Sequence, residues 1–158
     1  MNNSTYVPQT EAELESWMKA HCYHFNNYAV NGSAITEGCG IERFGSLFIW
    51  YYTERGQQTR LKYFYTEREI VEYAFSQIKA DKWARAHCIG FTENEAEKKE
   101  LAALLTNRSI EFFQDAIPYY GPGRPVYRTF VTGCAIKEVA PLKSRYYKQI
   151  NNNPQEHQ

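Results

Sequence analysis

The sequence predicts an α+β fold in which a small antiparallel β-sheet, arranged as a meander, is packed on one face by about three helices. Three segments open with the pattern Thr-Glu-x-Glu, which is typical of a helix N-terminus, and short β-rich runs separated by turns lie between the first two. No internal repeat or linker-like segment interrupts the chain. We therefore expect one domain over residues 1–150, followed by a disordered polar tail over residues 151–158.

The first helix is expected to begin after Thr10. In this capping box the Thr10 side chain accepts a backbone N–H of the first turn, and Glu13 reaches back to the backbone N–H of Thr10. Apolar residues then recur at three- and four-residue spacing as far as Phe25, which predicts a helix that continues to about that residue. Asn31-Gly32 marks a tight turn after it.

Three β-type runs follow, and glycine-containing turns separate them, so an antiparallel meander is the simplest interpretation. In the last run Arg60 and Lys62 alternate with apolar residues, and one face of that strand is expected to meet water. The runs cover residues 39–44, 47–53 and 59–65, and the turns fall at residues 45–46 and 55–58.

Two further capping boxes, which begin at Thr66 and Thr92, predict two more helices. The first of these carries a buried apolar stripe and is expected to run to about His87. The second buries several leucines and is expected to continue through Phe113. These helices and the first one make the three that cover the sheet.

A segment rich in proline and glycine, residues 118–125, ends the helical pattern, and a late strand is expected over residues 126–131. Tyrosine and arginine are concentrated around this turn, and these two residue types supply a large share of interface hot spots. Two interpretations stay open, since the rings can contact a partner or can pack on the sheet. The residues concerned are Tyr119, Tyr120, Arg124, Tyr127 and Arg128.

Charge and composition exclude some classes of partner. The 158 residues contain 18 basic and 18 acidic side chains, so the chain lacks the basic footprint of a typical nucleic-acid binder. No stretch approaches the roughly 20 apolar residues of a membrane span. The 13 tyrosines exceed what a small core requires, and tyrosine is well suited to protein interfaces.

Candidates for catalysis are few and scattered. A small hydrolase or nuclease-like enzyme would use His87 or His24 with a carboxylate, and Cys88 is the nearest thiol to His87. The four cysteines form no Cys-x-x-Cys pair, so we expect no metal site and no other cofactor. A regulatory domain whose aromatic residues line a small-molecule pocket is a further alternative.

Glu54-Arg55-Gly56 places a carboxylate and a guanidinium beside a glycine at a predicted hairpin. The structural interpretation is the stronger one, because Gly56 can supply the positive φ angle that a tight hairpin needs. Glu54 and Arg55 are then solvated or paired across the strands.

The segment from Trp50 to Phe75 resembles the immunity protein 63 family of bacterial polymorphic toxin systems. That family has an aromatic strand that ends in Glu-Arg-Gly, a return strand, and a capped helix that ends in aromatic residues. The resemblance covers about residues 40–115. It is carried by Glu54, Arg55, Gly56, Glu69, Ile70, Val71 and Phe75, whereas Glu72 and the extension from Pro118 depart from the family pattern.

The resemblance implies a cytoplasmic antitoxin of a contact-dependent growth inhibition system. Such a protein binds a cognate toxin domain and blocks its active site, and it is not itself an enzyme. Arg55 and Gly56 are expected to shape the hairpin. The residues expected to contact the toxin are Tyr119, Tyr120, Arg124, Tyr127 and Glu54.

Overall fold

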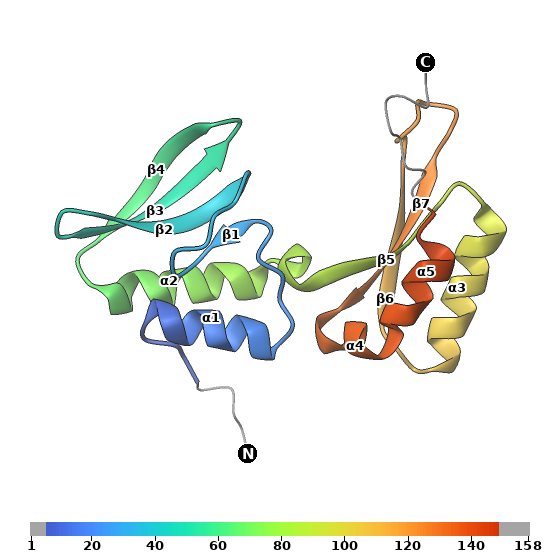
Figure 1. Ribbon diagram of the computed structural model, residues 1–158, viewed down its shortest axis with the longest axis horizontal. Coiled ribbons are helices and arrows are strands. Elements are labelled where there is room, and N and C mark those ends of the chain that lie inside the picture. The colour runs from blue at the N-terminus through green and yellow to red at the C-terminus, as the bar shows by residue number, and fades with distance from the viewer. Residues whose placement is uncertain (1–5, 149–158) are drawn as a thin grey trace. The chain divides into compact units, whose positions relative to one another are not determined.

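The computed structural model describes residues 6–148. The chain divides into two compact units, Met1–Arg85 and Ala86–Gln158, and each contains its own small sheet and helices (Figure 1). The α+β class expected from the sequence is confirmed. Whether the units act as one domain over residues 1–150 stays a prediction, and the expected tail over residues 151–158 lies outside the described residues.

Unit 1 is a four-stranded sheet of order β1-β2-β3-β4 with two helices on one face (Figure 1). The predicted meander of β2, β3 and β4 is confirmed, and a short strand β1 adds to β2 in parallel. The elements are α1 (Glu11–Ala20), β1 (Tyr28–Ala29), β2 (Gly38–Phe44), β3 (Leu47–Glu54), β4 (Gln57–Phe64), α2 (Glu67–Ala80) and the 3-10 turn η2 (Lys82–Arg85).

The core of unit 1 lies between the sheet and its helices. The stripe predicted on α2 is buried, and it packs with Leu14 and Met18 of α1 against Phe48 and Trp50 of β3. Single sheets of this size need such a cover, because one layer cannot bury an apolar face by itself. The buried stripe of α2 consists of Ile70, Val71, Ala74, Phe75 and Ile78.

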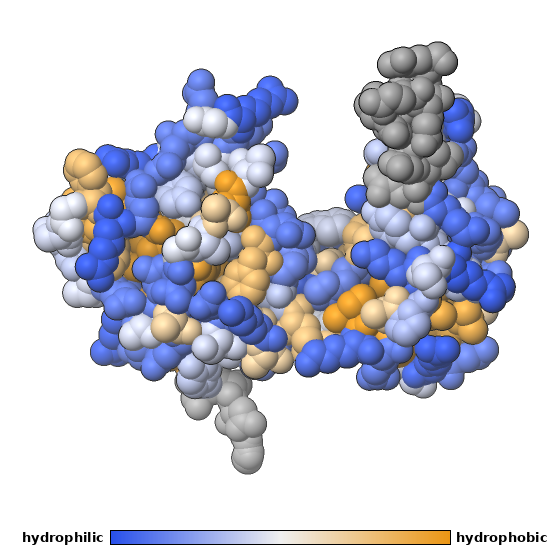
Figure 2. Space-filling view, in the orientation of Figure 1, coloured by the Kyte–Doolittle hydropathy of each residue, from blue (hydrophilic) through white to orange (hydrophobic). Residues whose placement is uncertain are grey.

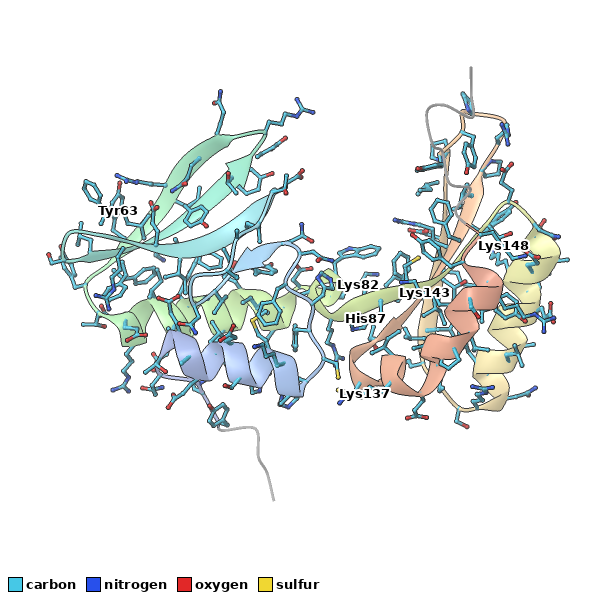
Figure 3. All side chains as sticks on the ribbon, viewed as in Figure 1. Tyr63, Lys82, His87, Lys137, Lys143 and Lys148 are labelled. Atoms are coloured by element: carbon cyan, nitrogen blue, oxygen red, sulfur yellow. The ribbon has the colours of Figure 1, made fainter. Side chains whose placement is uncertain are left out.

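Strand β4 is more exposed than the sequence predicts. One water-facing side was expected, yet every residue from Gln57 to Tyr63 is exposed, and only Phe64 packs against the core. The reason is position, since β4 is the edge strand of the sheet. Tyr63 lies on the side of the sheet away from the helices (Figure 3), and polar and apolar residues are interspersed on the visible face of this unit (Figure 2).

The helix starts of unit 1 follow the predicted caps. Thr10 accepts the N–H of Glu13 and Thr66 accepts the N–H of Glu69, each at 3.1 Å. The glutamate side chains of the two capping boxes accept a backbone N–H one residue before the predicted one. The carboxylate of Glu13 accepts the N–H of Gln9 rather than that of Thr10.

Helix α1 ends earlier than the prediction of about Phe25. Its last residue is Ala20, and Cys22 has a left-handed φ of 60°. The N–H of Tyr23 donates to the carbonyl of Met18, which completes a Schellman motif at the helix C-terminus. Glycine usually marks this position, so the sequence gives no stop signal here.

Unit 2 is a three-stranded antiparallel sheet of order β5-β7-β6 with helix α3 packed on it. Its core joins Ile89 of β5 and Val131 of β7 to Leu101 and Leu105 of α3 and to Tyr146 of α5. The elements are β5 (Ala86–Thr92), α3 (Glu95–Asn107), β6 (Phe112–Ile117), β7 (Val126–Thr132), the 3-10 turns η3 (Gly133–Ala135) and η4 (Ala140–Leu142), and the short helices α4 (Ile136–Val139) and α5 (Lys143–Tyr146).

The late strand predicted over residues 126–131 is confirmed as β7, whereas two predicted helix extensions are wrong. His87 lies in strand β5, because α2 ends at Ala80 and Asp81 then caps the turn η2 by accepting the N–H of Trp83 at 2.9 Å. Phe113 lies in strand β6. Helix α3 stops in a second Schellman motif, in which Ser109 has a φ of 59°.

The third capping box is shifted by two residues. Asn94, rather than Thr92, is the N-cap of α3, and its side chain accepts the N–H of Ala96 at 2.8 Å. Thr92 instead ends strand β5 and accepts the N–H of Asn94 at 3.0 Å. Asparagine is at least as good an N-cap as threonine, so a helix start at either Thr92 or Asn94 agrees with the N-cap preferences of these residues.

We predict that Thr66→Ala lowers the free energy of unfolding by about 1 kcal/mol, because the helix loses its side-chain cap. The matched substitution Thr66→Ser keeps the hydroxyl and should stay within about 0.5 kcal/mol of the unchanged chain. Urea unfolding of the three proteins measures the difference. Equal stability of the alanine and serine variants would contradict the cap.

Candidate functional site

The turn between β6 and β7 presents the tyrosines that the sequence analysis selected. Two backbone hydrogen bonds close it, from the N–H of Gly121 to the carbonyl of Pro118 at 3.1 Å and from that of Arg124 to Gly121 at 3.0 Å. Tyr119 is 45% exposed, and its ring meets the ring of Tyr120 edge to face at 4.8 Å. The turn therefore carries a fixed aromatic pair at its surface.

Arg124 connects this turn to the residues that precede helix α3. Its Nη2 lies 3.0 and 2.9 Å from the two carboxylate oxygens of Glu93. The same guanidinium lies 4.7 Å from the centre of the Tyr120 ring. Exposed ion pairs contribute little stability, typically below about 1 kcal/mol, but a bidentate pair with a stacked ring restricts the geometry of the side chains.

An open cleft of about 270 Å³ lies between this turn, the end of β5 and the start of α3. Phe91 and Val126, both buried, supply its apolar wall. Tyr119 packs behind this wall, with its ring 5.2 Å from that of Phe91. The lining residues are Phe91, Thr92, Glu93, Asn94, Glu97, Tyr120, Val126 and Lys148.

Glu97 is the best-connected polar group of the cleft. Its carboxylate accepts the hydroxyl of Thr92 at 2.6 Å and the ammonium of Lys148 at 3.3 Å. These contacts hold the pKa of Glu97 below its usual value, and the Thr92 hydrogen bond is the main cause. The carboxylate is therefore ionised at neutral pH. Lys148, labelled in Figure 3, is placed by its own backbone N–H, which donates to the carbonyl of Phe91 at 2.6 Å.

The hydroxyl of Tyr120 is buried and has no hydrogen-bond partner among residues 6–148. Leaving a buried polar group unpaired costs about 1–3 kcal/mol. Native structures rarely keep such a group without a reason. This hydroxyl is the chemically unusual feature of the turn between β6 and β7.

Tyr127 and Arg128 lie beyond the turn, in strand β7. The ammonium of Lys98 on α3 lies 5.0 Å from the centre of the Tyr127 ring, so this tyrosine packs between the sheet and the helix. Arg128 forms a bidentate pair with Asp115 of β6, with one distance of 2.8 Å. The sequence left open whether these rings pack on the sheet or contact a partner. Tyr127 is partly packed, whereas Tyr119 is 45% exposed.

The remaining selected residues lie in unit 1, at the β3–β4 hairpin. The positive φ expected for Gly56 is confirmed at 80°, and Arg55 also has a left-handed φ of 54°. Glu54 accepts the hydroxyl of Tyr52 at 2.8 Å, which raises the pKa of that tyrosine. A shallow hollow of about 340 Å³ adjoins these side chains.

The two histidines of the enzyme alternative lie in different units. His24 belongs to unit 1 and His87 to unit 2. Both ring nitrogens of His24 have backbone partners, since Nε2 lies 2.7 Å from the carbonyl of Trp83 and Nδ1 accepts the N–H of Asn26 at 3.3 Å. Burial raises the pKa of the free Cys88 thiol, which lowers its content of reactive thiolate.

Residues 6–148 contain no cluster of three or more histidine, cysteine or acidic side chains that could hold a metal ion. In the same range, no helix is both long and apolar enough to span a bilayer. Comparison of the chain with protein-family models, with curated proteins and with solved structures gives no match.

Sequence reasoning did not select the residues that form the other side of the cleft. Glu93 and Glu97 belong to a charged run that is typical of the solvated face of a helix, and Thr92 was predicted to be a helix cap. Phe91 and Lys148 were not considered. Their only sequence signal is the run from Phe91 to Asn94, which joins a strand end to a strong N-cap.

We predict that Arg55→Asn raises the free energy of unfolding by about 0.5–1 kcal/mol. The left-handed conformation costs an ordinary residue about 1 kcal/mol or more, and Asn-Gly is a preferred pair for such turns. Arg55→Ala is the matched control, because it removes the same side chain and keeps that cost. Urea unfolding checks the pair, and an equal effect of both substitutions would contradict the account of the hairpin.

We predict that Tyr120→Phe leaves the free energy of unfolding unchanged or raises it by about 1 kcal/mol, because it removes an unpaired buried hydroxyl. Tyr28→Phe is the control, since the Tyr28 hydroxyl donates to Asp81 at 2.7 Å. That variant should lose about 1–2 kcal/mol. A loss of similar size in both variants would show that the Tyr120 hydroxyl has a partner in the free protein.

Proposed function

We propose that this chain is an immunity protein, an antitoxin that binds a cognate bacterial toxin domain and blocks its active site. The observation that supports the proposal best is the surface around Tyr119, Tyr120 and Arg124. It combines an exposed ring, a stacked guanidinium and an open cleft. Tyrosine and arginine in such a setting are typical hot spots of protein interfaces.

The rigidity of this surface favours binding of a protein. The Tyr120 ring is held between Tyr119 and the paired Arg124, so little side-chain entropy remains to be lost when a partner binds. Ordering a flexible side chain at an interface costs about 0.5–1.5 kcal/mol, and a preformed surface avoids that cost. The cleft of about 270 Å³ suits a single side chain of a partner.

The resemblance to the immunity protein 63 family supplies the class of partner. It rests on the β3–β4 hairpin and on the start of α2, which lie in unit 1, whereas Tyr119, Tyr120, Arg124 and Tyr127 lie in unit 2. In this proposal the protein acts in the cytoplasm of the bacterium, needs no cofactor and performs no catalysis. Glu54 belongs to the proposed contact set as the member from unit 1.

We predict that the chain co-purifies with the toxin domain encoded immediately upstream of its gene and restores growth when the two are co-expressed. Tyr119→Ala should weaken the complex by about tenfold or more, the loss expected of an interface hot spot. Titration calorimetry measures the affinity. Thermal unfolding of the free variant shows whether the fold is kept.

The control for this experiment is Tyr65→Ala, because Tyr65 is 80% exposed, lies in unit 1 and is not among the proposed contact residues. Its affinity should equal that of the unchanged chain. Absence of a complex and of growth rescue would overturn the proposed function. Equal weakening by both substitutions would refute the location of the interface while leaving the function in place.

A further inference from the structure

Strand β4 lies at the edge of the four-stranded sheet of unit 1, and no strand within residues 6–148 pairs with its outer side. An edge of this kind presents a row of backbone N–H and C=O groups that another extended chain can bind. Many edge strands are short, contain proline or lie under another element, which prevents such binding. Strand β4 has eight residues, contains no proline or glycine, and is exposed from Gln57 to Tyr63. Its edge is therefore open to strand addition.

The protection that β4 does carry is charge, on both faces of the strand. Lys62 pairs with the core residue Trp50 of β3, on the face that the helices cover. The register then shifts, and Arg60 pairs with Tyr51, which points to the opposite face. Arg60 already has a carboxylate partner, since its Nε lies 3.3 Å from Oε2 of Glu42 on β2.

Lys62 has no carboxylate partner among residues 6–148. Its ammonium lies 4.7 Å from the centre of the Tyr73 ring of α2, on the helix-covered face. A carboxylate at the neighbouring position of an added strand would form an attractive cross-strand pair with this ammonium. A second copy of β4 would instead bring the cations of one copy beside those of the other, which is destabilising. Charge therefore favours an acidic segment over self-association.

The opposite face of β4 offers apolar contacts. Tyr63 lies on the side of the sheet away from the helices (Figure 3), and it is more than half exposed. Its partner in β3 is the buried Ile49. Side chains of an added strand alternate between the two faces, so the residues next to a carboxylate that faces Lys62 would lie beside Tyr63. Apolar side chains at these positions would bury surface that is now exposed to water.

We propose that the outer side of β4 binds an extended acidic segment of another protein by strand addition. The segment alternates carboxylate side chains, one of which faces Lys62, with apolar side chains that cover Tyr63. This inference makes no use of the proposed function, since it depends only on residues of unit 1.

The test is an NMR titration of the full chain with the capped peptide Ser-Val-Glu-Val-Glu-Val-Ser. A matched peptide has lysine in place of both glutamates. A third peptide keeps the glutamates but is methylated at every backbone nitrogen between the two serines, so it cannot donate hydrogen bonds to a strand. Only the first peptide should give saturable shifts of the backbone amides of residues 57–63.

Lys62→Glu should reverse the preference between the glutamate and lysine peptides. It should weaken binding of the glutamate peptide by about fivefold or more, because an attractive cross-strand pair becomes a repulsive one. Lys62→Gln removes the charge alone and should bind both peptides equally. Lys19→Glu is the control, since it changes the net charge by the same amount on α1, where the Lys19 side chain is 66% exposed. It should leave binding of the glutamate peptide unchanged.

No saturable shift, saturable shifts confined to unit 2, equal binding of the lysine peptide or binding of the methylated peptide would each overturn the inference. An unchanged preference in both Lys62 variants would do the same. Because no toxin is present, these outcomes are independent of co-purification and growth rescue, and either proposal can fail without the other.

Discussion

The ion pair between Arg124 and Glu93 is the interaction on which the candidate site depends. It joins a turn rich in glycine and proline to the residues that precede helix α3, and it places a guanidinium 4.7 Å from the centre of the Tyr120 ring. Two backbone hydrogen bonds close the turn itself, and the ion pair connects the turn to the residues before α3. The energy of an exposed pair is small, so its importance is geometric.

Two other contacts complete the same arrangement from different parts of the sequence. Phe91, at the end of β5, packs against Tyr119 and also receives the backbone N–H of Lys148 on its carbonyl. Glu97, in the first turn of α3, holds the side chains of Thr92 and Lys148. The cleft is therefore built where the end of β5, the start of α3, the β6–β7 turn and the segment after α5 converge, and such positions are commonly used for binding.

Helix starts were predictable and helix ends were not, for a physical reason. A cap is a local interaction, so Thr10 and Thr66 identify the starts of α1 and α2 by themselves. The ends of α1 and α3 depend on Cys22 and Ser109, which adopt left-handed conformations without being glycine. The residue types cysteine and serine do not indicate a left-handed conformation, so apolar spacing predicted both helices to be too long. The predicted extension of α3 covered the residues that form the start of strand β6.

The same distinction between local and distant contacts applies to the site. Tyr119, Tyr120 and Arg124 could be grouped from the sequence because one short turn contains them all. Glu93 could not be added, because it lies 31 residues from Arg124, and Lys148 lies 51 residues from Glu97. Such pairs are set by the packing of β5, β7 and α3, which periodicity alone does not reveal.

The central claim is that the surface around Tyr119 and the adjoining cleft binds a partner protein. Hydrogen exchange of the full chain, with and without the toxin domain encoded upstream, tests it most directly because it locates the contact without any substitution. The account predicts slower exchange of the backbone amides of residues 91–97 and 119–128 in the complex. Protection confined to other segments, with these amides unchanged, would contradict it.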